Sequence, residues 1–442
     1  MEKNLTSGSV ARNILHFSLP YLLSYFLQTL YGMADLYIIG QFDGVGNITA
    51  VSIGSQVMHM LTVMIVGLAM GATVTIARAV GAGKREHASV VIGNTAALFM
   101  GLSAIAAVCL LCFVRPIVSV MSTPAEAVSA AAAYLTVCFI GIPFITAYNM
   151  ISSIFRGLGD SKSPMYFIAA ACLLNVLLDY LLIGYFHLGA VGAALGTTLA
   201  QTASVAMAFF AMRRRRESGL SWKWEYLRPQ AGTMGQILKI GVPVALQDGF
   251  IQIAFIVITV IANRRGLNEA AAVGIVEKVI GMVFLVPSTM LSTVSALAAQ
   301  NIGAGKPDRA ELTLRYAVLL TIGYGLLVSA AVQFTSVPIV GMFTGDAVVK
   351  KLGGQYLRGY IWDCIFAGVH FSFSGYFCAY GRSGISFFHN FLSIVCVRIP
   401  GAYLASAYFP ATLFPMGLAA PAGSFLSVLI CAAAWMRMKR LS

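Results

Sequence analysis

The chain has 442 residues, of which 59% are hydrophobic and only 10% are charged. A soluble domain carries about 25% charged residues, so this composition excludes an ordinary soluble enzyme or binding module and predicts a polytopic membrane protein. The net charge of +13 is explained by basic loops beside the membrane, and we expect no nucleic-acid partner.

Apolar stretches that are long enough to cross a bilayer as helices, at about 20 residues each, follow one another along the whole chain. In order they cover residues 14–40, 50–77, 88–114, 126–154, 164–186, 190–212, 235–262, 272–299, 311–334, 350–378, 384–408 and 413–436. We therefore predict an all-α polytopic membrane protein with twelve transmembrane helices. Six of them form an N-lobe (1–212), and six form a C-lobe (235–442), with a cytoplasmic linker (213–234) between the lobes.

The two halves repeat one pattern. Residues 50–165 and 272–387 align at a constant offset of 222, and the sequence Gly-Ala-Gly-Lys at 81–84 returns at 303–306. Self-similarity on this scale indicates one fold that has been duplicated. In an apolar chain, duplicated halves are typical of transporters that rock around a central site.

Basic residues gather in the loops after the even-numbered helices and at the two termini. Because Lys and Arg mark the cytoplasmic side of a membrane, both termini are expected in the cytoplasm. The loops on that side contain Arg78, Lys84, Arg85, Arg156, Lys162, Arg213 to Arg216, Lys306, Arg309 and Arg382.

The chain contains no motif that would supply a catalytic or nucleotide-binding centre. Its eight cysteines lie inside apolar stretches. Cys109 and Cys112 have the spacing of metal ligands, but no second Cys or His pair accompanies them, so we expect no metal site there. The Gly-Ala-Gly-Lys sequence at 81–84 lacks the Ser or Thr of a phosphate-binding loop, and a tight turn explains it better. We expect no enzyme activity and no cofactor, so energy for transport would come from an ion gradient.

Ionisable groups within a spanning helix cost about 3 kcal/mol or more to insert, so each one needs an explanation. In the first half Asp35 and Asp179 are predicted at similar depth, with Asn175 on the same helix face as Asp179. Thr197 and Thr198 reach this depth from the sixth helix. Such an all-oxygen cluster suits a proton shared between carboxylates or a Na⁺ ion. We predict a coupling-cation site here, with Asp35, Asn175 and Asp179 as the possible Na⁺ ligands.

The alternative is that Asp179 and Asn175 only tie helices together by hydrogen bonds. The second half does not repeat the cluster, because Val257 or Ile258 stands where Asp35 would be and no acid occurs between 385 and 410. A purely architectural network should survive in both copies, so the asymmetry favours a functional site.

The second half has its own ionisable residues within predicted helices, and these are candidates for a substrate cavity. They are Asp248, Glu277, Asp363, His370 and Arg398. Asp363 and Arg398 are predicted at similar depths, so a salt bridge between them is expected. A structural pair and a substrate site both remain open for these two residues.

Several local sequences together resemble the multidrug and toxic compound extrusion (MATE) family over essentially the whole chain. They are Pro20, the stretch 35–40, the two Gly-Ala-Gly-Lys turns, the stretch 155–161, residues 175–179 with Gly189 and Gly192, and 398–400. The resemblance implies two six-helix lobes around a central cavity. It also implies that Asp35, Asn175, Asp179 and a helix 6 threonine form the N-lobe cation site. Some members place coupling acids in helices 7 and 10, where this chain has Asp248 and Asp363.

The function implied by the resemblance is secondary active multidrug efflux, in which amphiphilic, mostly cationic compounds leave in exchange for H⁺ or Na⁺. We expect a monomer in the bacterial cytoplasmic (inner) plasma membrane, whose partners are small organic cations, the coupling ion and membrane lipid. The alternative is a flippase of related architecture for lipids or lipid-linked oligosaccharides. Such a flippase should have more cavity-facing arginines, and here only Arg398 lies deep in a predicted helix.

Overall fold

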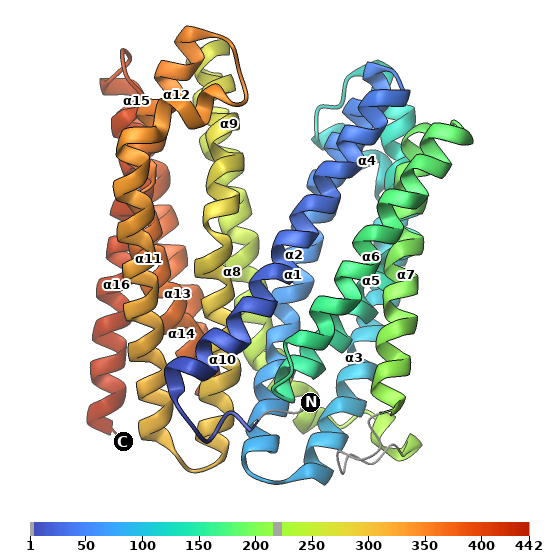
Figure 1. Ribbon diagram of the computed structural model, residues 1–442, viewed down its shortest axis with the longest axis vertical. Coiled ribbons are helices and arrows are strands. Elements are labelled where there is room, and N and C mark those ends of the chain that lie inside the picture. Colours follow the sequence, from blue (N-terminus) through green and yellow to red (C-terminus); the bar gives the residue numbers. More distant parts are fainter. Residues whose placement is uncertain (1–3, 215–222, 442) are drawn as a thin grey trace. The chain divides into compact units, whose positions relative to one another are not determined.

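The computed structural model describes residues 4–214 and 223–441. Part of the predicted inter-lobe linker, with Arg215 and Arg216, lies outside the described residues. Helices make up nearly all of the described part, and no strand occurs within it. Eleven helical segments there are long and apolar enough to cross a membrane, which confirms a multi-pass membrane protein (Figure 1).

The chain divides into two compact units. Unit 1 contains Leu19–Gly241 together with Met1–Asn4, and unit 2 contains Val242–Ser442 together with Leu5–Ser18. Helix α1 thus begins in unit 2 and continues in unit 1 after Ser18, whereas α8 begins in unit 1 and continues in unit 2 after Gly241. The lobe boundaries at 212 and 235 stay a prediction.

Unit 1 is a bundle in which α5 is the central helix. It packs against α2, α3 and α7, and α6 packs against α7. The helices are α1 (Val10–Phe42), α2 (Val45–Gly81), α3 (Arg85–Cys112), α4 (Val114–Val120), α5 (Ala125–Gly157), α6 (Lys162–Asp179), the π-helical turn η1 (Tyr180–Tyr185), α7 (Gly189–Arg214), the 3₁₀ turn η3 (Trp224–Leu227) and the start of α8 (Ala231–Asn263).

Unit 2 repeats this plan, with α10 packed against α13 as α2 is packed against α5. Its helices after α8 are α9 (Leu267–Val283), α10 (Leu285–Gly303), α11 (Pro307–Gly341), α12 (Ala347–Tyr360), α13 (Asp363–Ala379), α14 (Ser383–Ser393), the π-helical turn η4 (Ile394–Arg398), α15 (Ile399–Tyr408) and α16 (Phe414–Leu441).

The tenth predicted span is not one continuous helix. Residues 350–378 belong to α12 and α13, which are separated by a turn at Ile361 and Trp362. The amide of Cys364 donates to the carbonyl of Ile361 at 3.0 Å, so the chain turns tightly there. The break makes Asp363 the first residue of α13 and lets its side chain face the interior.

A duplicated hydrogen bond confirms the internal repeat. The hydroxyl of Thr73 on α2 donates to the carbonyl of Ser153 on α5 at 3.1 Å. At the same offset of 222, the hydroxyl of Ser295 on α10 donates to the carbonyl of Gly375 on α13 at 3.2 Å. Both bonds join the second and fourth predicted membrane spans of their half, so the two copies share this packing contact.

The Gly-Ala-Gly-Lys sequences are helix-ending turns in both units. Gly83 and Gly305 adopt φ values of 70° and 69°, a left-handed conformation that glycine adopts without steric cost. The amides of Lys84 and Lys306 then donate to the carbonyls five residues earlier, at 3.0 and 2.8 Å. This is the Schellman arrangement of a helix C-terminus, and it confirms that the motif is a turn.

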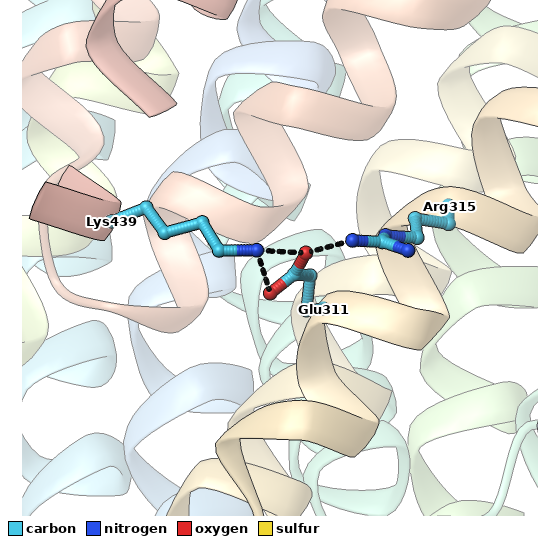
Figure 2. Close-up of polar contacts among 3 residues, drawn as sticks. All are labelled: Glu311, Arg315 and Lys439. Atoms are coloured by element: carbon cyan, nitrogen blue, oxygen red, sulfur yellow. Dashed lines mark hydrogen bonds and ion pairs between the residues drawn. The ribbon is translucent and has the colours of Figure 1, made fainter. Parts of the chain in front are cut away.

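The end of α16 is attached to the start of α11 by surface ion pairs. Figure 2 shows Glu311 between Arg315, at 2.5 Å, and Lys439, at 2.9 Å. The two basic side chains are more than half exposed. Exposed pairs of this kind contribute about 0–1 kcal/mol to stability. The contact therefore holds the end of α16 beside α11 but adds little to the free energy of unfolding.

Candidate functional site

Asp35 is the centre of a polar cluster inside unit 1. Its side chain lies on α1 and is only 2% exposed. The hydroxyl of Thr197 on α7 donates to Asp35 Oδ2 at 3.1 Å, and the side chains of Asp179 and Asn175 adjoin the same carboxyl group. The last two residues are four apart on α6 and so share one face of that helix. Three helices therefore converge on one carboxyl group.

The polar atoms of this cluster are mostly without partners. Among the described residues, no donor reaches Asp35 Oδ1 or either carboxyl oxygen of Asp179, and both amide atoms of Asn175 are also unpaired. A buried polar atom without a partner costs about 1–3 kcal/mol. Two carboxylates, an amide oxygen and a hydroxyl are the donors that Na⁺ or a shared proton needs. The residues present thus fit a small cation.

Thr198 does not join its neighbour in the cluster. A Cβ atom built on Gly141 of α5 would lie 2.7 Å from Thr198 Cγ2 and 2.8 Å from its Oγ1, so Thr198 packs into the α5 backbone. Its hydroxyl is buried, and no partner is found within the described part of the chain. Of the two predicted threonines, the structure brings Thr197 to Asp35 and turns Thr198 toward α5.

A small cavity of about 50 Å³ lies beside the cluster within unit 1. This is room for a few water molecules or an ion, since one water needs about 10–15 Å³ by the same measure. Most of the residues that line the cavity were not predicted from the sequence. Helical spacing could have indicated two of them, because Tyr31 is four residues before Asp35 and Gln201 is four residues after Thr197. The lining also includes Gln28, Met58, Thr62, Tyr134, Cys138, Ile145, Tyr148 and Asn149.

Unit 2 contains a buried carboxylate that has its own cation. Asp363 is fully buried, Arg398 is 7% exposed, and Arg398 Nη2 lies 3.8 Å from Asp363 Oδ2. The same nitrogen donates to the hydroxyl of Tyr360. The guanidinium group also stands over the ring of Phe255 at 5.3 Å. The structure thus contains the expected Asp363–Arg398 pair, and the aromatic rings of Tyr360 and Phe255 pack around it.

Glu277 lies near this pair but has a neutral hydrogen-bond partner. The hydroxyl of Thr259 on α8 lies 3.0 and 3.1 Å from its two carboxyl oxygens. Arg398 lies close enough to interact with it through space. Lys278 interacts with it in the same way, so the two carboxylates, Glu277 and Asp363, have two basic groups near them, Arg398 and Lys278.

The other two candidates of unit 2 lie elsewhere in it. His370 on α13 is buried and packs its ring 5.4 Å from that of His389 on α14. Nε2 of His389 is 2.9 Å from the hydroxyl of Ser374. Asp248 on α8 lies in the neighbourhood of Cys378. His370 also lies close enough to Arg398 to interact with it through space.

Comparison with known proteins identifies the family. The MatE family profile matches residues 20–181 and 243–404, which are the two duplicated halves. The chain is 26% identical over 428 residues to the probable multidrug resistance protein YoeA of Bacillus subtilis (strain 168), covering 96% of this chain and 92% of that protein. It is 26% identical over 374 residues to the multidrug export protein MepA of Staphylococcus aureus (strain NCTC 8325 / PS 47), covering 84% and 82%.

Solved structures have the same fold. A crystal structure of MATE in complex with MaL6 superposes with a TM-score of 0.92 at 21% identity, over 99% of this chain and 98% of that one. At this identity the likeness establishes the fold alone. Because the family profile covers both halves, the chain belongs to the MatE (MATE) family of transporters.

Proposed function

We propose that this protein is an ion-coupled multidrug exporter, which moves amphiphilic and mostly cationic compounds out of the cell in exchange for H⁺ or Na⁺. The names of the two relatives describe multidrug resistance in B. subtilis and multidrug export in S. aureus. We further propose that both termini lie in the cytoplasm, which the basic loops on that side support.

The coupling ion is proposed to bind between Asp35 and Asp179. The single observation that carries this proposal is that two buried carboxyl groups adjoin each other and that their polar neighbours, within the part of the chain that the structure describes, are the uncharged Thr197 hydroxyl and Asn175 amide. Two such carboxylates repel each other strongly unless a proton or a metal cation is held between them. The pair should therefore take up a cation whenever substrate is absent.

Antiport requires the ion and the substrate to oppose each other's binding. Such coupling is reciprocal in binding free energy and commonly changes affinity by about 5- to 150-fold. Cation uptake removes the repulsion between Asp35 and Asp179 and lets α1 and α6 approach. In this account that approach favours the state that releases substrate, and Pro20 gives α1 a point where the helix can bend.

The experiment is substrate binding and transport by the Asp35→Asn and Asp179→Asn variants. In everted vesicles with a fluorescent cation, both variants should lose efflux driven by an imposed ΔpH or ΔNa⁺. In the purified protein, the dependence of substrate affinity on that ion should fall from the wild-type range to about onefold, because the one remaining carboxylate no longer faces a second one whose repulsion the cation relieves.

Thermal unfolding in detergent is the control for misfolding, and both variants should unfold near the wild-type temperature. If either variant pumped with undiminished ion dependence, that aspartate would be a structural tie between helices and the proposal for it would fail.

A further inference from the structure

Gly196 on α7 lies opposite the carboxyl group of Asp179. A Cβ atom built on Gly196 would fall well inside van der Waals contact with Asp179 Oδ1, and it would lie 3.4 Å from Asp179 Cγ and 3.6 Å from Asn175 Nδ2. The carboxyl group of Asp179 therefore occupies the space that a side chain at position 196 would need.

Helix propensity gives no reason for a glycine at this position. Gly196 lies inside α7 in a helical conformation, where alanine would favour the helix by about 1 kcal/mol. Gly192, one turn earlier on the same helix, is a useful comparison, because its Cβ would meet Ile183 and Leu182 at 3.2 Å and no atom of the cluster. Of these two glycines, only Gly196 leaves room for an ionisable group.

Gly196 is also the neighbour of Thr197, whose hydroxyl binds Asp35. A methyl group at 196 would push Asp179 Oδ1 back by about 1 Å to reach normal contact, or it would push α7 away from α6. The second movement would carry the Thr197 hydroxyl away from Asp35. Either relief of the clash changes the geometry in which the two carboxyl groups face a cation.

We infer that Gly196 is a positioning residue, which sets how closely Asp179 approaches Asp35 and thereby how tightly the pair holds its coupling cation. This inference rests on the proposed function of the pair. Ion and catalytic sites require their groups to be held within about 0.5 Å of the working geometry, so a displacement of about 1 Å is large enough to alter cation binding.

The test compares Gly196→Ala with Gly192→Ala, the matched control on the same face of α7. Substrate affinity of the purified protein is measured with a fluorescent cation across a series of pH and Na⁺ concentrations. Gly196→Ala should shift the ion concentration of half-maximal effect by about tenfold or more, whereas Gly192→Ala should stay within about twofold of wild type. Equal shifts in both variants would overturn the inference, because they would reflect helix packing alone.

A double-mutant cycle keeps the inference testable if Gly196→Ala folds poorly. When Asp179→Ala has already removed the carboxyl group, adding Gly196→Ala should cause little further loss of thermal stability, and the two changes should be non-additive. Additive destabilisation would overturn the inference. Failure of the proposed function has a different signature, since Asp179→Asn alone would then keep its ion dependence.

Discussion

The buried carboxylates of the two units have different neighbours. In unit 1, Asp35 and Asp179 adjoin each other among a hydroxyl and an amide. In unit 2, Asp363 lies 3.8 Å from the guanidinium of Arg398, a cation that is part of the chain. A covalently attached cation cannot be exchanged with solution, but a proton or Na⁺ can. On the proposed function, ion exchange therefore belongs to unit 1, and the buried pair of unit 2 is a fixed charge pair.

A common backbone feature accompanies these different charges. The fifth helix of each unit changes into a π-helical turn, directly after Asp179 in unit 1 and ending on Arg398 in unit 2. Such turns occur frequently at functional sites. They do not coincide at the offset of 222, so each unit has developed its own irregularity around its own charged residue. Duplication preserved the bundle, while the buried charges diverged.

The largest effect is expected on removing the fixed cation of unit 2. Arg398→Gln leaves Asp363 buried without a counter-charge, which typically costs about 3–5 kcal/mol of stability. Thermal unfolding in detergent would measure the loss. The double variant Asp363→Asn with Arg398→Gln should recover much of it, because the fully buried Asp363 then carries no unpaired charge, while Glu277 keeps its hydrogen bond to Thr259. A stable Arg398→Gln variant would show that Asp363 also relies on an exchangeable cation, and the contrast between the units would break down.

A smaller effect is expected at two adjacent threonines of unit 1, which form a matched pair. Thr197→Val removes the hydroxyl that donates to Asp35, and a hydrogen bond to a charged group contributes about 1.5–3 kcal/mol. The ion concentration of half-maximal effect on substrate affinity should therefore change about tenfold. Loss of the donor weakens Na⁺ binding and favours proton binding, so the direction of the change identifies the ion.

Thr198→Val is the control for that prediction, because Thr198 packs against Gly141 and not against the carboxyl groups. It should leave the ion dependence within about twofold of wild type. If the Thr198 variant changed the ion dependence and the Thr197 variant did not, the geometry assigned to the cluster would be wrong.

The smallest effect is expected at Glu277, the second carboxylate near Arg398 in unit 2. Its partner is the hydroxyl of Thr259, so Glu277→Gln keeps a hydrogen bond and should fold normally. If this charge attracts cationic substrates, their affinity should fall about tenfold, which corresponds to about 1.4 kcal/mol. Affinity for a neutral substrate of similar size should not change. An equal loss of affinity for both substrates would make Glu277 a structural residue. The Asp363–Arg398 pair would then be the remaining charged feature of this part of unit 2.

Much of the fold was predictable from the sequence, because hydropathy and repetition act over long segments. The spans, the duplication and the turn at Gly83 follow from apolar length and from glycine at a helix end. The break between α12 and α13 was not predictable. Residues 350–378 are long enough for one span, and the turn at Ile361 depends on tertiary contacts that place Asp363 inside unit 2.

The candidate site was predictable in its members but not in its geometry. Helix depth brought Asp35 and Asp179 to one level, and four-residue spacing added Asn175. Depth could not separate Thr197 from Thr198, because consecutive residues on a helix point about 100° apart and only packing decides which one faces α1. The role of Gly196 was not predictable, since a residue without a side chain has no chemistry of its own that would mark it in the sequence.

The most direct test of the account is the number of cations released when substrate binds. Purified protein loaded with ion can be mixed with a substrate cation while a pH indicator or a Na⁺ electrode records release. Wild type should release about one H⁺ or Na⁺ per substrate bound. Asp179→Asn should release none, while Asp363→Asn, whose charge is already balanced by Arg398, should release as much as wild type. Undiminished release from Asp179→Asn, or its loss from Asp363→Asn, would place ion exchange in unit 2 and contradict the account.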